Sequence, residues 1–476
     1  MINFEVTGAL AALFIASLAM FSGPIIAYAH ALLGFVSVAS VSVLVSLFFG
    51  PASIRPIVLV LSLVVMVLSL AIQQSKGAVF RARNLVWLGL FGVVVSASQL
   101  VSRKLGLSSV AFTDGHTIIK MGDAFQRGDY EPLSGIKALK RGFGLPAMQS
   151  LGFEGEYVVG LMPLFFLASI LATGWVVWVL TGNRTTAITV TAIIVPILLT
   201  TEAIARHIFL MNTHSIAWLL TAVLLGYAAK ASRDGLTRKD SYGVLTAFAA
   251  VGFLRFDYLL LFAGFTFFFI LVTARSRPVF ALSTVFVQVV ATLGWTSRLV
   301  NDFPIFGTYG AFIVPLVAMV LGGGLVWSIR HLGNARMTQS SIPLFVPAGL
   351  VFGLLLVLTN MPASLKNLGT NLFLGEGLWG FTPVFVILIT VASYIKPRVM
   401  ETQLARQLAG IGALTVALYV LSKYGDGPSV VSSSGFVRIG FGDSLNRTLV
   451  TWIPFLVLPL IRLIGEVSSE KRKKGL

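Results

Sequence analysis

The chain has 476 residues, of which 56% are hydrophobic and 11% are charged, and it contains no cysteine. Its mean hydropathy of +0.91 lies far outside the range of soluble globular domains, so the composition predicts an integral membrane protein. The absence of cysteine excludes disulfides, thiol catalysis and cysteine-based metal sites.

Apolar runs recur from residue 6 to residue 465, and each is long enough to cross roughly 30 Å of hydrocarbon. They predict an all-α, polytopic bundle of about 13 to 15 transmembrane helices. The first run lacks the positively charged leader of a cleaved signal peptide, so we expect a retained span. The predicted spans are 6–21, 24–49, 57–74, 84–101, 157–181, 186–201, 208–229, 241–255, 257–273, 279–299, 309–329, 343–360, 379–395, 406–422 and 449–465.

The basic residues predict the topology. The cations at 471–474 are placed in the cytoplasm by the positive-inside rule, and the other loops alternate backwards from them. This assigns 20 Lys and Arg and five acids to the inside, and 15 cations and 13 acids to the outside. The net charge of +17 is therefore mainly a topology signal, and we expect no nucleic-acid partner.

Four parts follow from this topology, and no internal repeat is evident. Residues 1–101 form N-terminal transmembrane helices, and 102–156 form an extracytoplasmic loop. Residues 157–465 form the transmembrane core with its outer loops, and 466–476 form a basic cytoplasmic tail. We expect the N-terminus to lie outside.

The outer loop is the one long hydrophilic stretch, and it holds six of the 18 carboxylates, so chemistry is expected there. Within it Ile118, Met121 and Phe125 share one face, a spacing that suits a helix lying on the membrane surface. A second short helix is predicted over 136–141, and Pro146 then starts the return to the bilayer.

Several of these features occur together in one known family. An acid near the start of the outer loop and a short amphipathic helix precede a return segment that reads Arg141-Gly142-Phe143-x-x-Pro146, and an Arg-x-Asp turn follows at 255–257. Over roughly residues 108–277 this pattern resembles the GT-C superfamily of polyprenyl-phosphate-dependent membrane glycosyltransferases.

The chain departs from that family at two points. Asp114 is followed by Gly115 and His116, where several members have a second acid, and no soluble domain is expected after the last span. Both differences argue against the oligosaccharyl and protein-mannosyl branches.

The resemblance implies sugar transfer from a polyprenyl-phosphate donor to a glycolipid or cell-envelope glycan, on the extracytoplasmic face of the cytoplasmic membrane. Its implied base is Asp114, since a lipid-phosphate sugar already has a good leaving group and needs chiefly a base and cations. The position of Asp114 also suits a helix N-cap. Asp123 lies about 180° around a continuous helix, so no carboxylate pair is expected.

Cations at the outer ends of spans are expected to bind the donor. Arg255 is the sharpest candidate, because fifteen helical residues from Asp240 reach about 22 Å, close to the outer interface. Its alternative is a local pair with Asp257. The other substrate-binding candidates are His116, Lys137, Lys140, Arg141, Arg206, His207, His214, Arg438 and Arg447. A surface that faces lipid headgroups is the alternative for Lys137, Lys140 and Arg141. Arg206 and Arg447 each also have an acid four residues before them, which suits a purely structural pair.

The sequence leaves a metal cofactor open. Asp114 with His116 can bind a divalent cation such as Mg or Mn, although a histidine beside a helix start is also commonly solvated. An O-antigen-type polymerase or ligase that uses a diphosphate-linked glycan is an alternative function, disfavoured by the acid at the loop start. A lipid or glycan flippase or transporter is another, disfavoured because the charges gather at the outer interface and no repeat is seen.

Overall fold

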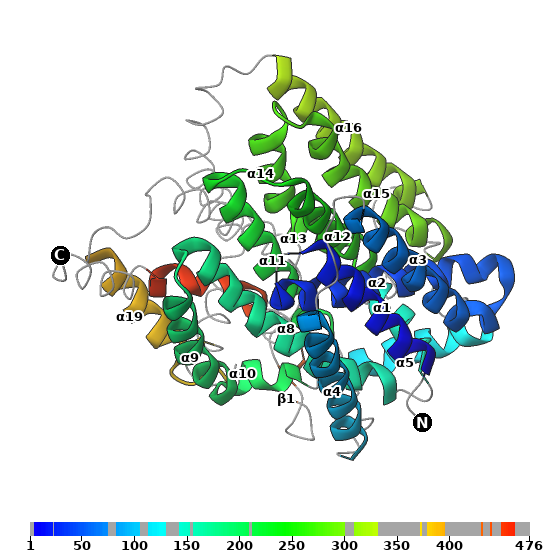
Figure 1. Cartoon of the computed structure of the whole chain (residues 1–476), viewed down its shortest axis with the longest axis horizontal. Coiled ribbons are helices and arrows are strands. Elements are labelled where there is room, and N and C mark those ends of the chain that lie inside the picture. Colours follow the sequence, from blue (N-terminus) through cyan, green and yellow to red (C-terminus); the bar gives the residue numbers. More distant parts are fainter. Residues whose placement is uncertain are drawn as a thin grey trace.

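The computed structural model of the chain is almost wholly helical in its described part (Figure 1). Two short strands, β1 (Val430–Val431) and β2 (Arg438–Ile439), pair antiparallel. The described residues are 4–21, 23–74, 82–104, 113–129, 142–152, 156–208, 212–299, 309–331, 372–373, 378–395, 430–431, 438–439 and 449–461.

The helices follow the apolar runs of the sequence closely. In chain order they are α1 (Phe4–Met20), α2 (Pro24–Phe49), η1 (Pro51–Ser53), α3 (Ile54–Gln74), α4 (Ala82–Lys104), α5 (Thr113–Arg127), α7 (Gly144–Gln149), α8 (Glu156–Thr181), α9 (Arg184–Thr200), α10 (Glu202–Ala205), η4 (Arg206–Ile208), α11 (His214–Arg233), α12 (Arg238–Leu254), α13 (Tyr258–Leu261), α14 (Ala263–Thr273), α15 (Pro278–Leu299), α16 (Gly310–His331), α19 (Thr382–Ile395) and η6 (Val450–Leu456).

Within the described residues, six helices are long and apolar enough to cross a membrane. A seventh is added if α9 and the segment Glu202–Ile208, which meet at a bend of 90°, count as one broken span. The predicted polytopic helical architecture therefore agrees with the structure. The predicted spans 343–360 and 406–422 lie outside the described residues, and the total of about 13 to 15 spans stays a prediction.

The helix α3 buries polar side chains in the bundle and exposes apolar ones on its outer surface. Its polar residues Ser62, Ser69 and Gln73 are buried among neighbouring helices, whereas Val67 and Leu68 are each 58% exposed. A helix on the surface of a soluble protein has the reverse arrangement. Apolar side chains outside and polar ones inside are expected where hydrocarbon is the surrounding solvent.

Close packing at the centre depends on two glycines. A Cβ at Gly226 of α11 would lie 2.0 Å from the ring of Trp175 in α8, and one at Gly243 of α12 would lie 2.2 Å from the hydroxyl of Tyr227. That hydroxyl lies 2.8 Å from Nε2 of His30 in α2. Four helices thus interlock at one level of the bundle.

Contacts between connecting segments fall into two groups. On one face, which we call the α5 face, Gly128 lies against Pro51, and the Phe143 amide donates to the Leu254 carbonyl at 3.0 Å. The Ala203 amide likewise donates to the carbonyl of Leu378. All of these residues were predicted to lie outside, except Leu254, which was predicted at the outer end of the span 241–255.

On the other face, which we call the opposite face, Lys230 pairs with Asp240 at 2.8 Å. Arg277, which directly precedes α15, also contacts the first turn of α12 there: its Nη1 lies 3.2 Å from Oγ of Ser241. Lys230, Asp240 and Arg277 were predicted to lie inside, and Ser241 at the inner end of the span 241–255. The loop contacts therefore group the segments in the same way as the charge pattern.

Candidate functional site

The helix α5 begins earlier than the sequence predicted. Residues 113–115 belong to the helix (Thr113–Arg127) and do not precede it, so Asp114 is a residue of the helix and not its N-cap. The helix is continuous to Asp123, so nine residues at 100° each leave the two carboxylate positions about 180° apart, as predicted. The side chains of Asp114 and His116 lie outside those described.

The apolar face of α5 is covered by protein. Ile118, Met121 and Phe125 are 2%, 3% and 0% exposed, and α5 packs against α7. Nε2 of Gln126 also donates to the carbonyl of Ser150 at 2.7 Å. The expectation of a helix lying on the membrane surface is therefore wrong for this face, because amphipathic spacing alone does not distinguish a lipid surface from a buried segment.

The return segment after the loop is anchored in the bundle. Gly142 has a φ of +78°, and a Cβ there would lie 1.8 Å from the Leu254 carbonyl oxygen, so glycine is required twice over. The ring of Phe143 stacks on Trp295 at 6.0 Å and meets Phe125 edge-on at 5.5 Å. Every residue of α7 is buried. The return segment therefore ties α5 to the end of α12.

The end of α12 positions Arg255. The helix ends at Leu254, and Arg255 is extended, which turns its side chain towards Asp257. Nε and Nη2 of Arg255 donate to Oδ1 and Oδ2 of Asp257 at 2.8 and 2.7 Å, a bidentate pair. The guanidinium also lies 5.3 Å from the ring centre of Tyr258. The local pair, which the sequence offered as the alternative for Arg255, is thus present.

A buried hydrogen-bonded chain leads from this turn to the start of α11. The hydroxyls of Tyr258 and Thr213 lie 2.6 Å apart, and the amide of His214 donates to Oδ1 of Asn212 at 3.0 Å. Nδ2 of Asn212 lies 3.4 Å from Nδ1 of His207. The rings of His207 and His214 meet edge-on at 6.0 Å.

We call this set of residues on the α5 face the polar cluster. Its members come from η4, the start of α11 and the turn between α12 and α13, which the contacts above bring together. The polar cluster comprises His207, Asn212, Thr213, His214, Arg255, Asp257 and Tyr258.

Three of the predicted substrate-binding residues, His207, His214 and Arg255, meet in the polar cluster. Half-buried Arg206 precedes His207 directly. Thr213 and Tyr258 were not predicted, although each adjoins a predicted polar residue in sequence; their contact across 45 residues has no local signal. Lys137, Lys140, Arg141 and Arg447 lie outside the described residues, and Arg438 is placed in β2 without a described side chain.

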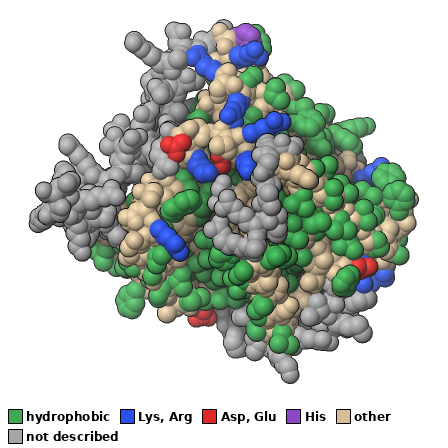
Figure 2. Space-filling view, viewed as in Figure 1, with side chains coloured by type: hydrophobic (Ala, Val, Ile, Leu, Met, Phe, Trp, Pro, Cys, Tyr) green, Lys and Arg blue, Asp and Glu red, His purple; other side chains and the backbone are tan. Residues whose placement is uncertain are grey.

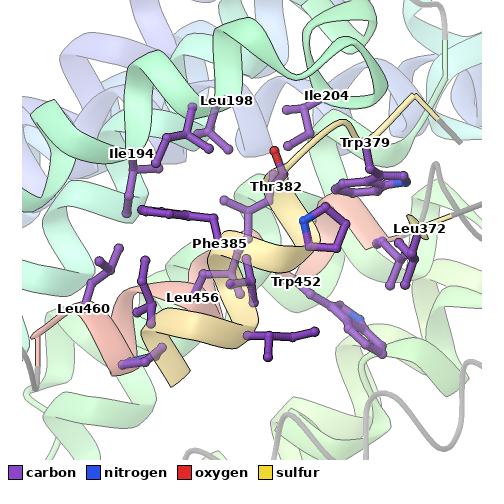
Figure 3. A pocket seen from close by; sticks show the side chains of 18 of the residues that line it. Ile194, Leu198, Ile204, Leu372, Trp379, Thr382, Phe385, Trp452, Leu456 and Leu460 are labelled. Atoms are coloured by element: carbon purple, nitrogen blue, oxygen red, sulfur yellow. The ribbon is translucent and has the colours of Figure 1, made fainter. Parts of the chain in front are cut away.

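An apolar cavity of about 250 Å³ lies between α9, α10, α19 and η6 (Figure 3). Ile194, Leu198, Trp379, Phe385 and Trp452 are among the side chains that line it. Ile204 of α10 also lines it, two residues before Arg206. The bent α9–α10 segment therefore lines this cavity and leads directly into the polar cluster at His207.

A metal site is not formed by the described side chains. Among them, no group of three or more His, Asp or Glu residues could hold a metal ion. The pair that the sequence offered for a divalent cation, Asp114 and His116, lies outside the side chains described.

The chain was compared with models of protein families, with curated proteins and with solved structures, and no match was found. The structure defines the class: a polytopic helical protein with several apolar helices of membrane-spanning length. The polar cluster on the α5 face is the feature of this structure that bears on its function.

Proposed function

We propose that the protein is a membrane glycosyltransferase of the GT-C type, which moves a sugar from polyprenyl phosphate to a glycolipid or cell-envelope glycan. One observation carries the proposal. The two segments on which the resemblance rests, the loop return at Gly142–Pro146 and the turn at 255–257, are far apart in sequence and lie in direct contact. A coincidental match of two short patterns would not require them to meet.

The polar cluster supports a role in binding a phosphate-linked sugar. Asp257 uses both oxygens to hold the guanidinium of Arg255 in one plane, and a guanidinium has five N–H donors in all. Because the pair is neutral overall, the negative charge of a phosphate needs a further cation. Arg206 lies next to the cluster in sequence and is half-buried, and we assign it that role.

The reaction would proceed with Asp114 as general base. Asp114 takes the proton from the acceptor hydroxyl, whose oxygen forms a bond to the anomeric carbon of the sugar. The bond from that carbon to the phosphate oxygen breaks, and its electron pair leaves with polyprenyl phosphate. Arg206 and Arg255 then stabilise the added negative charge on the phosphate.

The apolar cavity supports a lipid carrier. Its lining includes Ile204, two residues before Arg206, so a hydrocarbon chain held there would have its phosphate near Arg206 if it left the cavity at α10.

The deciding experiment replaces Asp114 with Asn in purified protein supplied with a polyprenyl-phosphate sugar. We expect transfer to fall by about 10²-fold or more, because general-base catalysis contributes about that much, with the melting temperature unchanged. Asp129→Asn is the matched control: the residue is exposed and lies just after α5. Equal turnover in both variants would remove Asp114 as the base, and transport into proteoliposomes without a covalent product would favour a transporter.

A further inference from the structure

Four arginines form a continuous basic edge on the opposite face. Nε of Arg275 lies 3.4 Å from the carbonyl oxygen of Ile329, directly before Arg330. Arg277 reaches Ser241 in the first turn of α12, where Nε of Arg238 lies 3.2 Å from the hydroxyl of Tyr242. All four are exposed, and we call them the basic rim: Arg238, Arg275, Arg277 and Arg330.

The nearest acid on α12 does not neutralise the basic rim. Both oxygens of Asp240 are engaged, one by Lys230 at 2.8 Å and the other by Thr237. Figure 2 shows Lys and Arg side chains gathered at the top of the view beside a histidine, where α16 ends, with two acidic groups below them. The rim therefore presents an excess of positive charge.

An exposed apolar surface begins directly below the rim. On α15, Val279 is 77% exposed although it lies only two residues from Arg277, and Phe286 is 50% exposed. On α16, Val320 is 73% and Trp327 is 58% exposed. The ring of Trp327 stacks on His331 at 5.1 Å, which sets an aromatic pair at the level of the arginines.

We propose that the basic rim binds the phosphate headgroup of an anionic phospholipid, whose acyl chains lie along α15 and α16. The arginines present planar, charged donors that match phosphate oxygens. The exposed apolar surface begins within two residues of Arg277. A lipid has a charged headgroup next to apolar acyl chains and so matches both parts, whereas a soluble acidic partner would leave the apolar part uncovered. This site lies on the face opposite the polar cluster and does not depend on the proposed function.

The test uses the full-length protein in lipid nanodiscs. Wild type is compared in phosphatidylcholine alone and in phosphatidylcholine with phosphatidylglycerol, and we expect a higher melting temperature with phosphatidylglycerol. In the double variant Arg275→Gln/Arg277→Gln that increment should largely disappear. Phosphatidylglycerol binding, followed by native mass spectrometry, should weaken by about 30-fold, since each of the two cations near an anionic surface contributes about fivefold.

The control removes two exposed cations from the α5 face, as Lys120→Gln/Arg127→Gln, and should keep the phosphatidylglycerol increment. A general loss of stability lowers the melting temperature in both lipid mixtures equally, so only the increment is diagnostic. The proposal would be overturned if the control lost the phosphatidylglycerol-dependent rise in melting temperature to the same extent, or if wild type showed no such rise. Inorganic phosphate that reproduced the increment in phosphatidylcholine alone would also do so, by assigning the site to free phosphate.

Discussion

Arg255 forms the local pair with Asp257 that the sequence offered as the alternative to phosphate binding. Its side chain is 11% exposed and that of Asp257 is 26% exposed, so the pair is partly shielded from water. A bidentate pair of this kind fixes the plane of the guanidinium, whereas an isolated arginine keeps several rotamers. Pairing with Asp257 is therefore compatible with phosphate binding, and it defines the direction from which a phosphate would approach.

Asp240 leads to a prediction about pH. Burial by itself raises the pKa of this carboxyl, but hydrogen bonds from Lys230 and Thr237 together bring the pKa below its ordinary value of 3.8. A depressed pKa in the folded state means that the carboxylate stabilises the fold above about pH 4. That contribution is lost as the pH falls through the folded-state pKa.

We therefore expect Asp240→Asn to lower the melting temperature at pH 7 and to have a smaller effect at pH 3. The measurement is thermal unfolding in detergent from pH 7 to pH 3, with Asp129→Asn as the exposed control. If wild type and Asp240→Asn lost stability in parallel over this range, the Lys230–Asp240 pair would not be the source of the pH dependence.

At the scale of elements, the return segment 142–152 connects the outer loop to the helical bundle. Gly142 allows α7 to enter the bundle, because both its positive φ and its contact with Leu254 exclude a side chain. Phe143 then fills the space between α5 and α15. The position of α5, and with it Asp114, depends on this one connection.

Gly142→Ala should therefore release the return segment. We expect faster hydrogen exchange across residues 142–152 and lower transfer activity, since the Cβ would clash with the Leu254 carbonyl. Gly128→Ala is the matched control: Gly128 has a similar φ of +71°, but a Cβ there would meet Pro51 at an ordinary 3.4 Å. The same exchange rates in both variants would mean that backbone strain, and not the contact with α12, is what Gly142 relieves.

The helices of membrane-spanning length could be predicted because each is a continuous apolar run. The predicted span 24–49 coincides with α2, which starts at Pro24 and is followed by Gly50 with a φ of +89°. The start of α11 was predicted six residues too early, at 208. There the chain instead forms η4, and Asn212 accepts a hydrogen bond from the first amide of α11.

The candidate site was predictable only where its contacts are local. Arg255 and Asp257 are two residues apart, so their pairing could be proposed from the sequence. The contact between Thr213 and Tyr258, and that between Phe143 and Leu254, depend on how α7, α11 and α12 pack. Helical periodicity carries no information on such contacts, and for the same reason it did not show that α5 is covered by α7.

At the scale of the whole molecule, the connecting segments lie on two faces that differ in charge. The α5 face includes the polar cluster, and the opposite face includes the basic rim. Between them, α3, α4, α15 and α16 expose apolar side chains to the surroundings. This arrangement matches a bundle that crosses a membrane with the α5 face outside and the basic rim inside.

Because the natural chain has no cysteine, this orientation can be tested with single introduced cysteines. Asp129→Cys and Ser276→Cys place a thiol at exposed positions on the α5 face and the opposite face, respectively. In intact cells, a membrane-impermeant thiol reagent should label the first and should reach the second only after permeabilisation. The reverse pattern would invert the topology and place the polar cluster in the cytoplasm.

The buried return segment also bears on how a substrate of the proposed reaction would arrive. Every residue of α7 is buried, so this part of the loop is packed into the bundle and is not a free cover over it. A polyprenyl chain stays in the bilayer, so a lipid-linked donor would enter sideways from the plane of the membrane, and the spent carrier would leave by the same lateral route. Turnover would then depend on the fluidity and carrier content of the surrounding membrane as much as on the protein.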